Sequence, residues 1–341
     1  MAESDGASFS DDEARGDGAA KTPRRARIGV IVNRKSHRNK AGLAPLPDDD
    51  DAMLVRYPDQ REDLDGALED FARAGIDLLA ISGGDGTVRD VLTRGMQVFG
   101  DNWPPLLIVP QGKTNALAVN LGYSQAPPAD RWREMLAAGR FERRRPLALE
   151  TIKQGARRRT VYGFLFGAGV FNAAIDAGQT AHRFGAFQAF AVGVTAVYGI
   201  AQAVLGIGRS RWRSLSRMTI TSGPEETPLP AYSGDPERGR YLVGFSTLRK
   251  FPLGIRPFAG SGPSAGVDYF VLDRPSRLAV ALLPVALTGS DTETMRKAGM
   301  HRGTGSEFRV ALADGFILDG EAFPAGTYRI SAGPDLAFLV P

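Results

Sequence analysis

The chain has 341 residues, 43% hydrophobic and 23% charged, so it is long enough for two globular domains with ample apolar cores. It contains no cysteine, which excludes disulfides, thiolate metal ligands and a cysteine nucleophile, and is consistent with a reducing compartment. The formal net charge is +4, but residues 1–20 carry a net charge of −5, which leaves +9 for the rest. A body this basic favours anionic partners, either nucleic acid or phospholipid headgroups.

The first segment, residues 1–25, is rich in Gly, Ser, Asp and Ala and contains no apolar run. It is therefore not a signal peptide, and its composition predicts a disordered acidic tail.

Residues 26–145 alternate between apolar strands and amphipathic helices. Strands are predicted at 26–33, 77–81 and 106–109, and helices from residue 61 to a stop at Gly75, over 88–98, and over 115–120. This alternation predicts an α/β domain with a doubly wound parallel sheet and helices on both faces. In such sheets ligands bind at the carboxyl ends of the strands.

Residues 146–341 have a different pattern. Short β-rich runs separated by Gly, Pro and Ser predict an antiparallel β-sandwich, with strands at 160–166, 217–221, 240–246, 267–273, 307–312 and 327–331. One uncharged stretch, residues 184–208, interrupts them. Its polar stripe at Gln188, Thr195 and Gln202 favours an inserted helix that packs or faces a membrane over a lone membrane span.

The strand at 77–81 runs into a glycine loop made of Gly83, Gly84, Asp85, Gly86 and Thr87. Glycines here expose backbone amides at the start of a helix, which suits an anionic phosphate. An acid between them has no structural need, so Asp85 is expected to hold magnesium through water or to act as a base. The alternative is a tight strand-to-helix turn with no ligand.

A second loop, residues 110–115, repeats this architecture one strand later. Gly112 permits close approach, and Thr114 and Asn115 supply short hydrogen-bonding groups suited to a nucleotide. Alone the loop is explained nearly as well by an N-cap turn. Paired with the first glycine loop, it predicts that both line one crevice.

A late acidic motif contains Asp319 and Glu321. On an extended strand these two side chains would point the same way, and neighbouring carboxylates can raise one pKa and so create a general base for a hydroxyl. The alternative is a polar hairpin turn.

In order, Gly-Gly-Asp-Gly-Thr (83–87), Pro-x-Gly-x-Thr-Asn (110–115) and Leu-Asp-Gly-Glu (318–321) resemble the diacylglycerol kinase catalytic-domain family. That family includes sphingosine kinases, ceramide kinases and bacterial lipid kinases. The resemblance runs from about Ile28 to the C-terminus, and the stretch 250–260 is also similar to the bacterial members.

The resemblance implies a kinase that uses ATP and Mg²⁺ to phosphorylate a lipid hydroxyl, with the site between an N-terminal nucleotide domain and a C-terminal lipid-binding sandwich. It implies an anionic membrane surface as partner, no nucleic acid, and a cytoplasmic location at the inner face of the membrane; a homo-oligomer stays open. Carried over by motif, the nucleotide-binding residues are Asn33, Ser36, Gly83, Gly84, Asp85, Gly86, Thr87, Gly112, Thr114 and Asn115. Asp85 is also the implied metal ligand, and the implied catalytic acids are Asp319, Asp85 and Glu321, with Asp319 slightly ahead as the base.

The chain departs from the family pattern at several positions. Its first loop reads Asn-Arg-Lys-Ser-His (33–37) where Asn-Pro-x-Ser-Gly is usual, and Arg89-Asp90 replaces the usual Asn-Glu. Ala116 replaces an Asp, and the run 115–118 is closer to the sphingosine kinase branch. An NAD kinase and a non-catalytic lipid-binding regulator are the alternatives.

Overall fold

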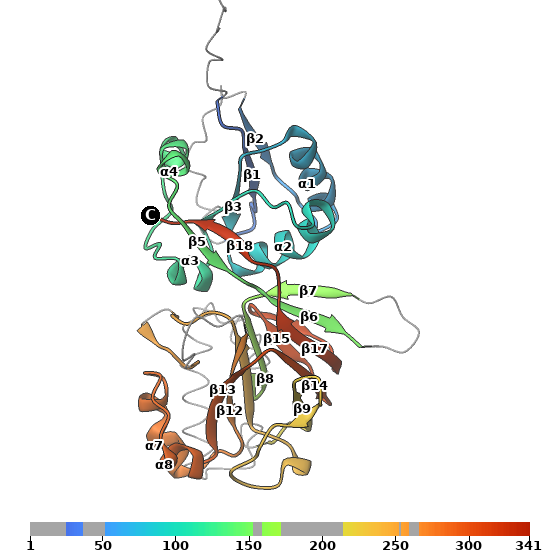
Figure 1. Ribbon diagram of the computed structural model, residues 1–341, viewed down its shortest axis with the longest axis vertical. Helices are drawn as coiled ribbons and strands as arrows, with labels where there is room; N and C mark the ends of the chain where they lie inside the picture. The colour runs from blue at the N-terminus through green and yellow to red at the C-terminus, as the bar shows by residue number, and fades with distance from the viewer. Residues whose placement is uncertain (1–24, 37–51, 153–158, 172–213, 252–253, 259–265) are drawn as a thin grey trace, which may run out of the picture.

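Two units of different architecture are stacked along the long axis of the molecule (Figure 1). The computed structural model describes residues 25–36, 52–152, 159–171, 214–251, 254–258 and 266–341. The expected acidic tail, apart from Arg25, and the expected helix over 184–208 lie outside these residues. None of the helices in the described ranges combines the length and hydrophobicity needed to cross a bilayer.

The first unit is built on a six-stranded sheet with the order β2-β1-β3-β4-β18-β5. All neighbours are parallel except β18 and β5. β1, β3 and β4 are buried along their whole length, which explains their continuous apolar sequences. The strands are Ile28–Val32 (β1), Met53–Arg56 (β2), Leu78–Gly83 (β3), Leu106–Pro110 (β4), Phe141–Arg144 (β5) and Leu336–Leu339 (β18).

Helices cover this sheet, with α1 and α2 on one side and α3 and α4 on the other (Figure 1). They are Asp63–Ala74 (α1), Asp85–Phe99 (α2), Ala116–Asn120 (α3) and Trp132–Ala138 (α4), the last preceded by a 3₁₀ turn at Ala129–Arg131. α1 ends as predicted at Gly75, whose φ of 61° is left-handed. α2 begins three residues earlier than predicted, because the extended Gly84 already caps it.

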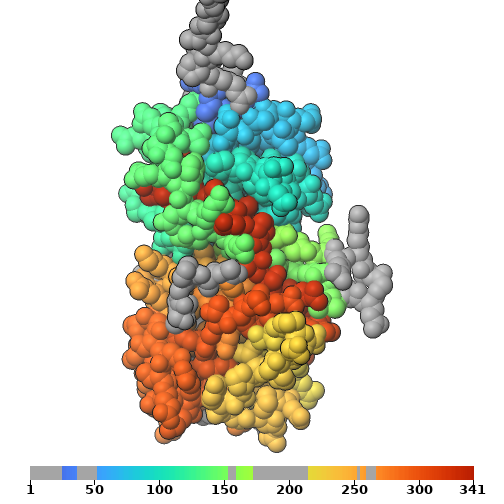
Figure 2. Space-filling view, viewed as in Figure 1, coloured from blue at the N-terminus to red at the C-terminus, as the bar shows by residue number. Residues whose placement is uncertain are grey.

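The last strand crosses back into the first unit. β18 pairs in parallel with β4 and antiparallel with β5. The sequence-based division at residue 145 assigned this strand to the second unit, whereas its hydrogen bonds place it in the first sheet. Figure 2 shows the red C-terminal residues packed against the green and cyan surface of the first unit.

The second unit consists of two six-stranded antiparallel sheets, ordered β10-β9-β14-β17-β6-β7 and β13-β12-β11-β8-β15-β16. Their facing side chains form one apolar core that includes Phe166, Phe245, Phe308 and Phe316, which confirms the predicted sandwich. The strands are Leu147–Thr151 (β6), Thr160–Gly163 (β7), Leu165–Gly169 (β8), Met218–Ser222 (β9), Thr227–Pro228 (β10), Leu242–Ser246 (β11), Val267–Leu272 (β12), Met300–Gly305 (β13), Glu307–Leu312 (β14), Phe316–Leu318 (β15), Glu321–Phe323 (β16) and Gly326–Ala332 (β17).

Two helices that the sequence did not predict, Arg277–Ala286 (α7) and Glu293–Lys297 (α8), pack beside the second of these sheets. Each begins at a side-chain N-cap, Ser276 for α7 and Thr292 for α8. Pro284 lies inside α7, and a proline in an apolar run argues against a helix in sequence analysis. A further 3₁₀ turn spans Pro236–Arg238.

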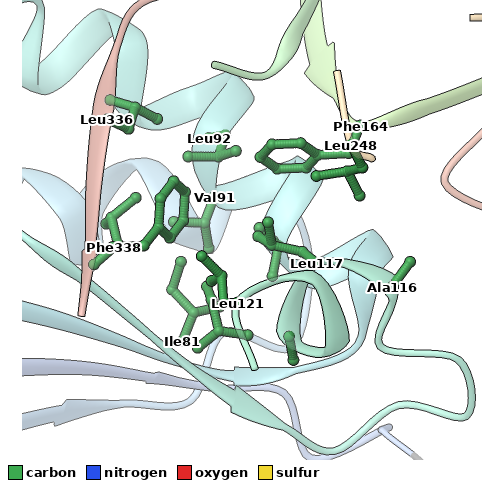
Figure 3. Packing of buried hydrophobic residues seen from close by; sticks show 14 of the residues in the cluster. Ile81, Val91, Leu92, Ala116, Leu117, Leu121, Phe164, Leu248, Leu336 and Phe338 are labelled. Atoms are coloured by element: carbon green, nitrogen blue, oxygen red, sulfur yellow. The ribbon is translucent and has the colours of Figure 1, made fainter. Parts of the chain in front are cut away.

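The junction of the two units is a continuous apolar cluster (Figure 3). Phe164 and Leu248 from the second unit meet Val91 of α2 and Phe338 of β18 there, and the rings of Phe164 and Phe338 have centroids 6.3 Å apart. Each buried side chain of this size stabilises the contact by about 1.5–3 kcal/mol. The junction therefore holds the ends of β3, β4 and β15 in a fixed relation.

Candidate active site

The two glycine loops touch one another at the carboxyl ends of β3 and β4. A Cβ added to Gly112 would lie 2.6 Å from the Cα of Gly84, and one added to Gly84 would lie 3.0 Å from the Cα of Gly112. The backbone N–H of Gln111 also donates to the carbonyl of Gly83 at 2.9 Å. Only glycine fits at this contact, so the pair of loops forms one continuous backbone surface next to the N-terminus of α2, as expected from the sequence.

The loop after β1 joins this surface. The Asn33 side-chain amide donates to the hydroxyl of Thr87 at 2.8 Å, and its backbone N–H donates to the Ser82 carbonyl at 3.0 Å. Ser36 is buried and closes a turn back onto Asn33. A Cβ on Gly83 would meet the Thr87 side chain at 2.5 Å. Asn33, Ser36, Gly83 and Thr87 are thus brought together, as the motifs predict.

Asn115 has a role within its own loop. Its side chain accepts from the N–H of Gly112 and donates to the carbonyl of Gly112, both at 2.8 Å, and its φ of 49° is left-handed. The side chain thereby fixes the shape of the loop, with Thr114 exposed beside it. Asn115 is therefore positioned to shape a nucleotide site through Gly112.

Asp85 is the first residue of α2, and its carboxylate accepts hydrogen bonds from the N–H groups of Ala116 (3.1 Å) and Leu117 (3.3 Å). These amides begin α3, so Asp85 ties the two loops together. The expectation that an acid has no structural need at this position was wrong. Burial raises the pKa of Asp85 in spite of these hydrogen bonds.

Asp319 faces Asp85 from the second unit. Its carboxylate accepts from the N–H of Phe164 at 3.0 and 3.1 Å and from that of Leu165 at 2.9 Å. Burial, followed by the charge of Asp85, raises the pKa of Asp319 to about 7. The carboxylates of Asp85 and Asp319, on different units, are thus close enough for the charge of one to act on the pKa of the other.

The predicted pairing of Asp319 with Glu321 on an extended strand was wrong. Asp319 and Gly320 form the two-residue turn between β15 and β16, with φ values of 49° and 81°, and Leu318 pairs with Glu321. The hairpin-turn alternative describes the backbone correctly. The turn separates the two acids, and the carboxylate whose charge raises the pKa of Asp319 is Asp85.

Glu321 instead forms ion pairs with Arg61 and Arg89. Burial alone would raise its pKa, but the Arg61 hydrogen bond and the nearby charge of Arg89 outweigh burial and hold the pKa below its usual range. Glu321 is therefore a neutralised anion and not a proton acceptor.

Sequence reasoning also missed the arginines that bind Glu321. Arg89 is 2% exposed, and Arg61 donates to Asp90 at 3.1 Å. The signal was the departure from the family at Arg89-Asp90, where an Asn-Glu pair is usual.

The site fits a divalent cation together with a nucleotide. The described ranges contain no group of three or more His, Asp or Glu residues able to hold a metal alone. Mg²⁺, however, is typically bound by one or two carboxylates plus substrate phosphates and water. Asp85, which follows Gly84 at the N-terminus of α2, offers one such carboxylate beside the glycine loops.

Glycine loops at the carboxyl ends of parallel strands, beside a helix N-terminus, are typical of phosphate-binding sites. Residues 27–145 match the family model of the diacylglycerol kinase catalytic domain. The family indicated by the motifs is thereby confirmed for this part of the chain.

Named relatives agree with the family match. The proteins named "Probable lipid kinase YegS" from Shigella flexneri and from Escherichia coli O1:K1 are each 30% identical over 100 residues, which is 28% of this chain and 33% of theirs. The chain thus spans about a third of the length of these curated relatives.

Solved structures show the fold over almost the whole chain. A diacylglycerol kinase from Bacillus anthracis str. Sterne matches 92% of this chain and 97% of its own with a TM-score of 0.58 at 15% identity. A further structure from that organism gives a TM-score of 0.60 at 14% identity over the same shares.

Proposed function

We propose that this protein is a lipid kinase that transfers the γ-phosphoryl group of ATP to a hydroxyl of a membrane lipid, either diacylglycerol or a ceramide or sphingoid lipid. The observation that carries the proposal is that α2, which begins at Asp85 beside the glycine loops, binds through Arg89 the hairpin whose turn carries Asp319. The family match over residues 27–145 and the naming of the relatives as lipid kinases support the same activity.

In this proposal the glycine loops bind phosphate. The backbone amides around Gly83–Thr87 and the N-terminus of α2 offer positive partial charge to the β- and γ-phosphates. A bound Mg²⁺ would neutralise charge that develops on the transferred group. Asp85 would hold that ion, directly or through water, while its bonds to Ala116 and Leu117 keep its carboxylate in place.

Asp319 is the general base of the proposed reaction. It accepts the proton of the lipid hydroxyl as the oxygen forms its bond to the γ-phosphorus and the bond to the ADP oxygen breaks. A pKa of about 7 suits this role, because a large part of the carboxylate is ionised near neutral pH and it still binds a proton well. Glu321, held by two arginines, stays ionised and supports the turn.

We also propose that the enzyme acts at an anionic membrane surface on the inner face of the membrane. This rests on the +9 charge of residues 21–341 and on the lipid nature of the acceptor.

The test is transfer of radiolabelled phosphate from [γ-³²P]ATP to a panel of diacylglycerol, ceramide, sphingosine and phosphatidylglycerol in mixed micelles with Mg²⁺. The proposal expects one lipid class to be labelled well above the others. Labelling of none of them, together with ATP-dependent phosphorylation of NAD, would replace the lipid kinase by an NAD kinase. ATP binding without any transfer would leave a non-catalytic regulator.

A further inference from the structure

Arg89 lies on α2 with 2% of its surface exposed. A buried guanidinium destabilises the folded state unless its donors are satisfied. Its Nη2 donates to Asp90 at 2.8 Å, its Nη1 donates to the backbone carbonyl of Leu318 at 3.2 Å, and it forms an ion pair with Glu321. The side chain is therefore fully engaged at the junction of the two units.

The contacts of Arg89 across the junction all fall on one hairpin. Leu318 and Glu321 flank its two-residue turn, and the ring of Phe323 has its centroid 5.7 Å from the guanidinium carbon. β16 is the edge strand of its sheet and pairs only with β15. Arg89 thus attaches an edge hairpin of the second unit to a helix of the first.

That hairpin carries Asp319 at its turn, and the helix carries Asp85 one turn before Arg89. Residues four apart on a helix lie on the same face. The helix α2 therefore carries Asp85 and, through Arg89, binds the turn that carries Asp319. We propose that Arg89 is a positioning residue that fixes the turn of Asp319 against Asp85 for phosphoryl transfer. The inference rests on the proposed function.

Arg61 binds the same two carboxylates as Arg89, those of Asp90 and Glu321. It donates to Asp90 at 3.1 Å and to Glu321 at 2.6 Å, with half of its side chain exposed. Arg61 and Arg89 each bind both Asp90 and Glu321, so these two carboxylates keep one arginine partner when Arg89 is changed. A lysine at position 89 keeps the charge, but it is a compact point charge that lacks the planar fork needed to reach Leu318 and Glu321 together.

The test compares Arg89→Lys and Arg89→Met with the wild-type protein. The matched control is Arg94→Met on the same helix, because Arg94 pairs with Asp65 and Glu62 of the first unit. Two quantities are measured for each protein. One is the kcat and the KM for MgATP, with dioctanoylglycerol and short-chain ceramide in micelles as acceptors; the other is hydrogen exchange at individual backbone amides.

Both Arg89 variants are expected to lose about 100-fold in kcat, because misplacing a reacting group by about 1 Å costs that much. Their KM for MgATP stays within about twofold, since the glycine loops are untouched. The amides of Phe164 and Leu165, which donate to the Asp319 carboxylate, and that of Asp319, which donates to the Leu165 carbonyl, exchange about tenfold faster. Arg94→Met changes neither quantity.

The inference is overturned if Arg89→Lys keeps wild-type kcat, whatever its exchange rates, or if KM for MgATP rises in step with the fall in kcat. If the wild-type protein labels no lipid, the proposed function fails on its own. Hydrogen exchange then tests whether Arg89 holds the turn of Asp319. Faster exchange in the Arg89 variants alone supports this role of Arg89, and unchanged exchange refutes it.

Discussion

Replacing Asp319 by Asn should stabilise the protein at alkaline pH, although it removes the proposed base. Its pKa is about 7 in the folded protein against 3.8 for an ordinary aspartate. The folded state therefore binds this proton more tightly than the unfolded state, and stability falls as the pH rises from about 4 through about 7. Asparagine keeps an acceptor for the amides of Phe164 and Leu165, and it tolerates the left-handed φ of 49°.

A pKa difference of about three corresponds to ~4 kcal/mol at most, and the partial exposure of the turn reduces the expected gain to ~2 kcal/mol. For a chain of this length that gain raises Tm by about 3 °C. The Tm values of Asp319→Asn and wild type are compared at pH 5 and pH 8.5 without nucleotide or Mg²⁺. The control is Asp130→Asn, because Asp130 is exposed. A gain at pH 8.5 that is no larger than the gain at pH 5 would refute the assigned pKa shift.

The remaining predictions concern the same site. The kcat/KM for lipid should rise with pH through a midpoint at about 7, because the Asp319 base must lose its proton; a flat profile between pH 6 and 8 contradicts this role. Gly112→Ala should weaken MgATP binding at least about tenfold by calorimetry, since its Cβ would lie 2.6 Å from the Cα of Gly84. Gly66→Ala, with open space around its Cβ, is the control that keeps wild-type affinity. Chelation with EDTA should stop transfer and added Mg²⁺ should restore it; activity that persists in EDTA would remove the metal from the mechanism.

Local patterns predicted the central strands β1, β3 and β4 because these strands are buried on both faces. Residues 78–81 and 106–109 are uninterrupted apolar runs that lead into glycine loops, so their position in a parallel sheet follows from sequence. β18 could not be placed in this way. Its four residues, Leu336–Leu339, follow a series of short strands and have the same pattern as those strands. Only the pairing with β4 and β5 in the folded chain assigns β18 to the first sheet.

The glycine loops were found from sequence because a requirement for glycine is local. The surroundings of Asp319 were not found from sequence, because they depend on the turn in which Asp319 lies. Two consecutive residues with positive φ reverse the chain between Asp319 and Glu321, and alternation along a strand then no longer applies. Glu321 meets Arg61 at a separation of 260 residues, which no local pattern encodes.

The central claim is that Asp85 and Asp319 form one phosphoryl-transfer site. The most direct measurement is the initial rate of phosphate transfer from [γ-³²P]ATP to the labelled lipid class, for wild type, Asp85→Asn, Asp319→Asn and the control Asp130→Asn. We predict that each of the two site variants loses at least about a thousandfold in kcat, and that the control keeps the wild-type rate. Wild-type turnover in both site variants would contradict the account.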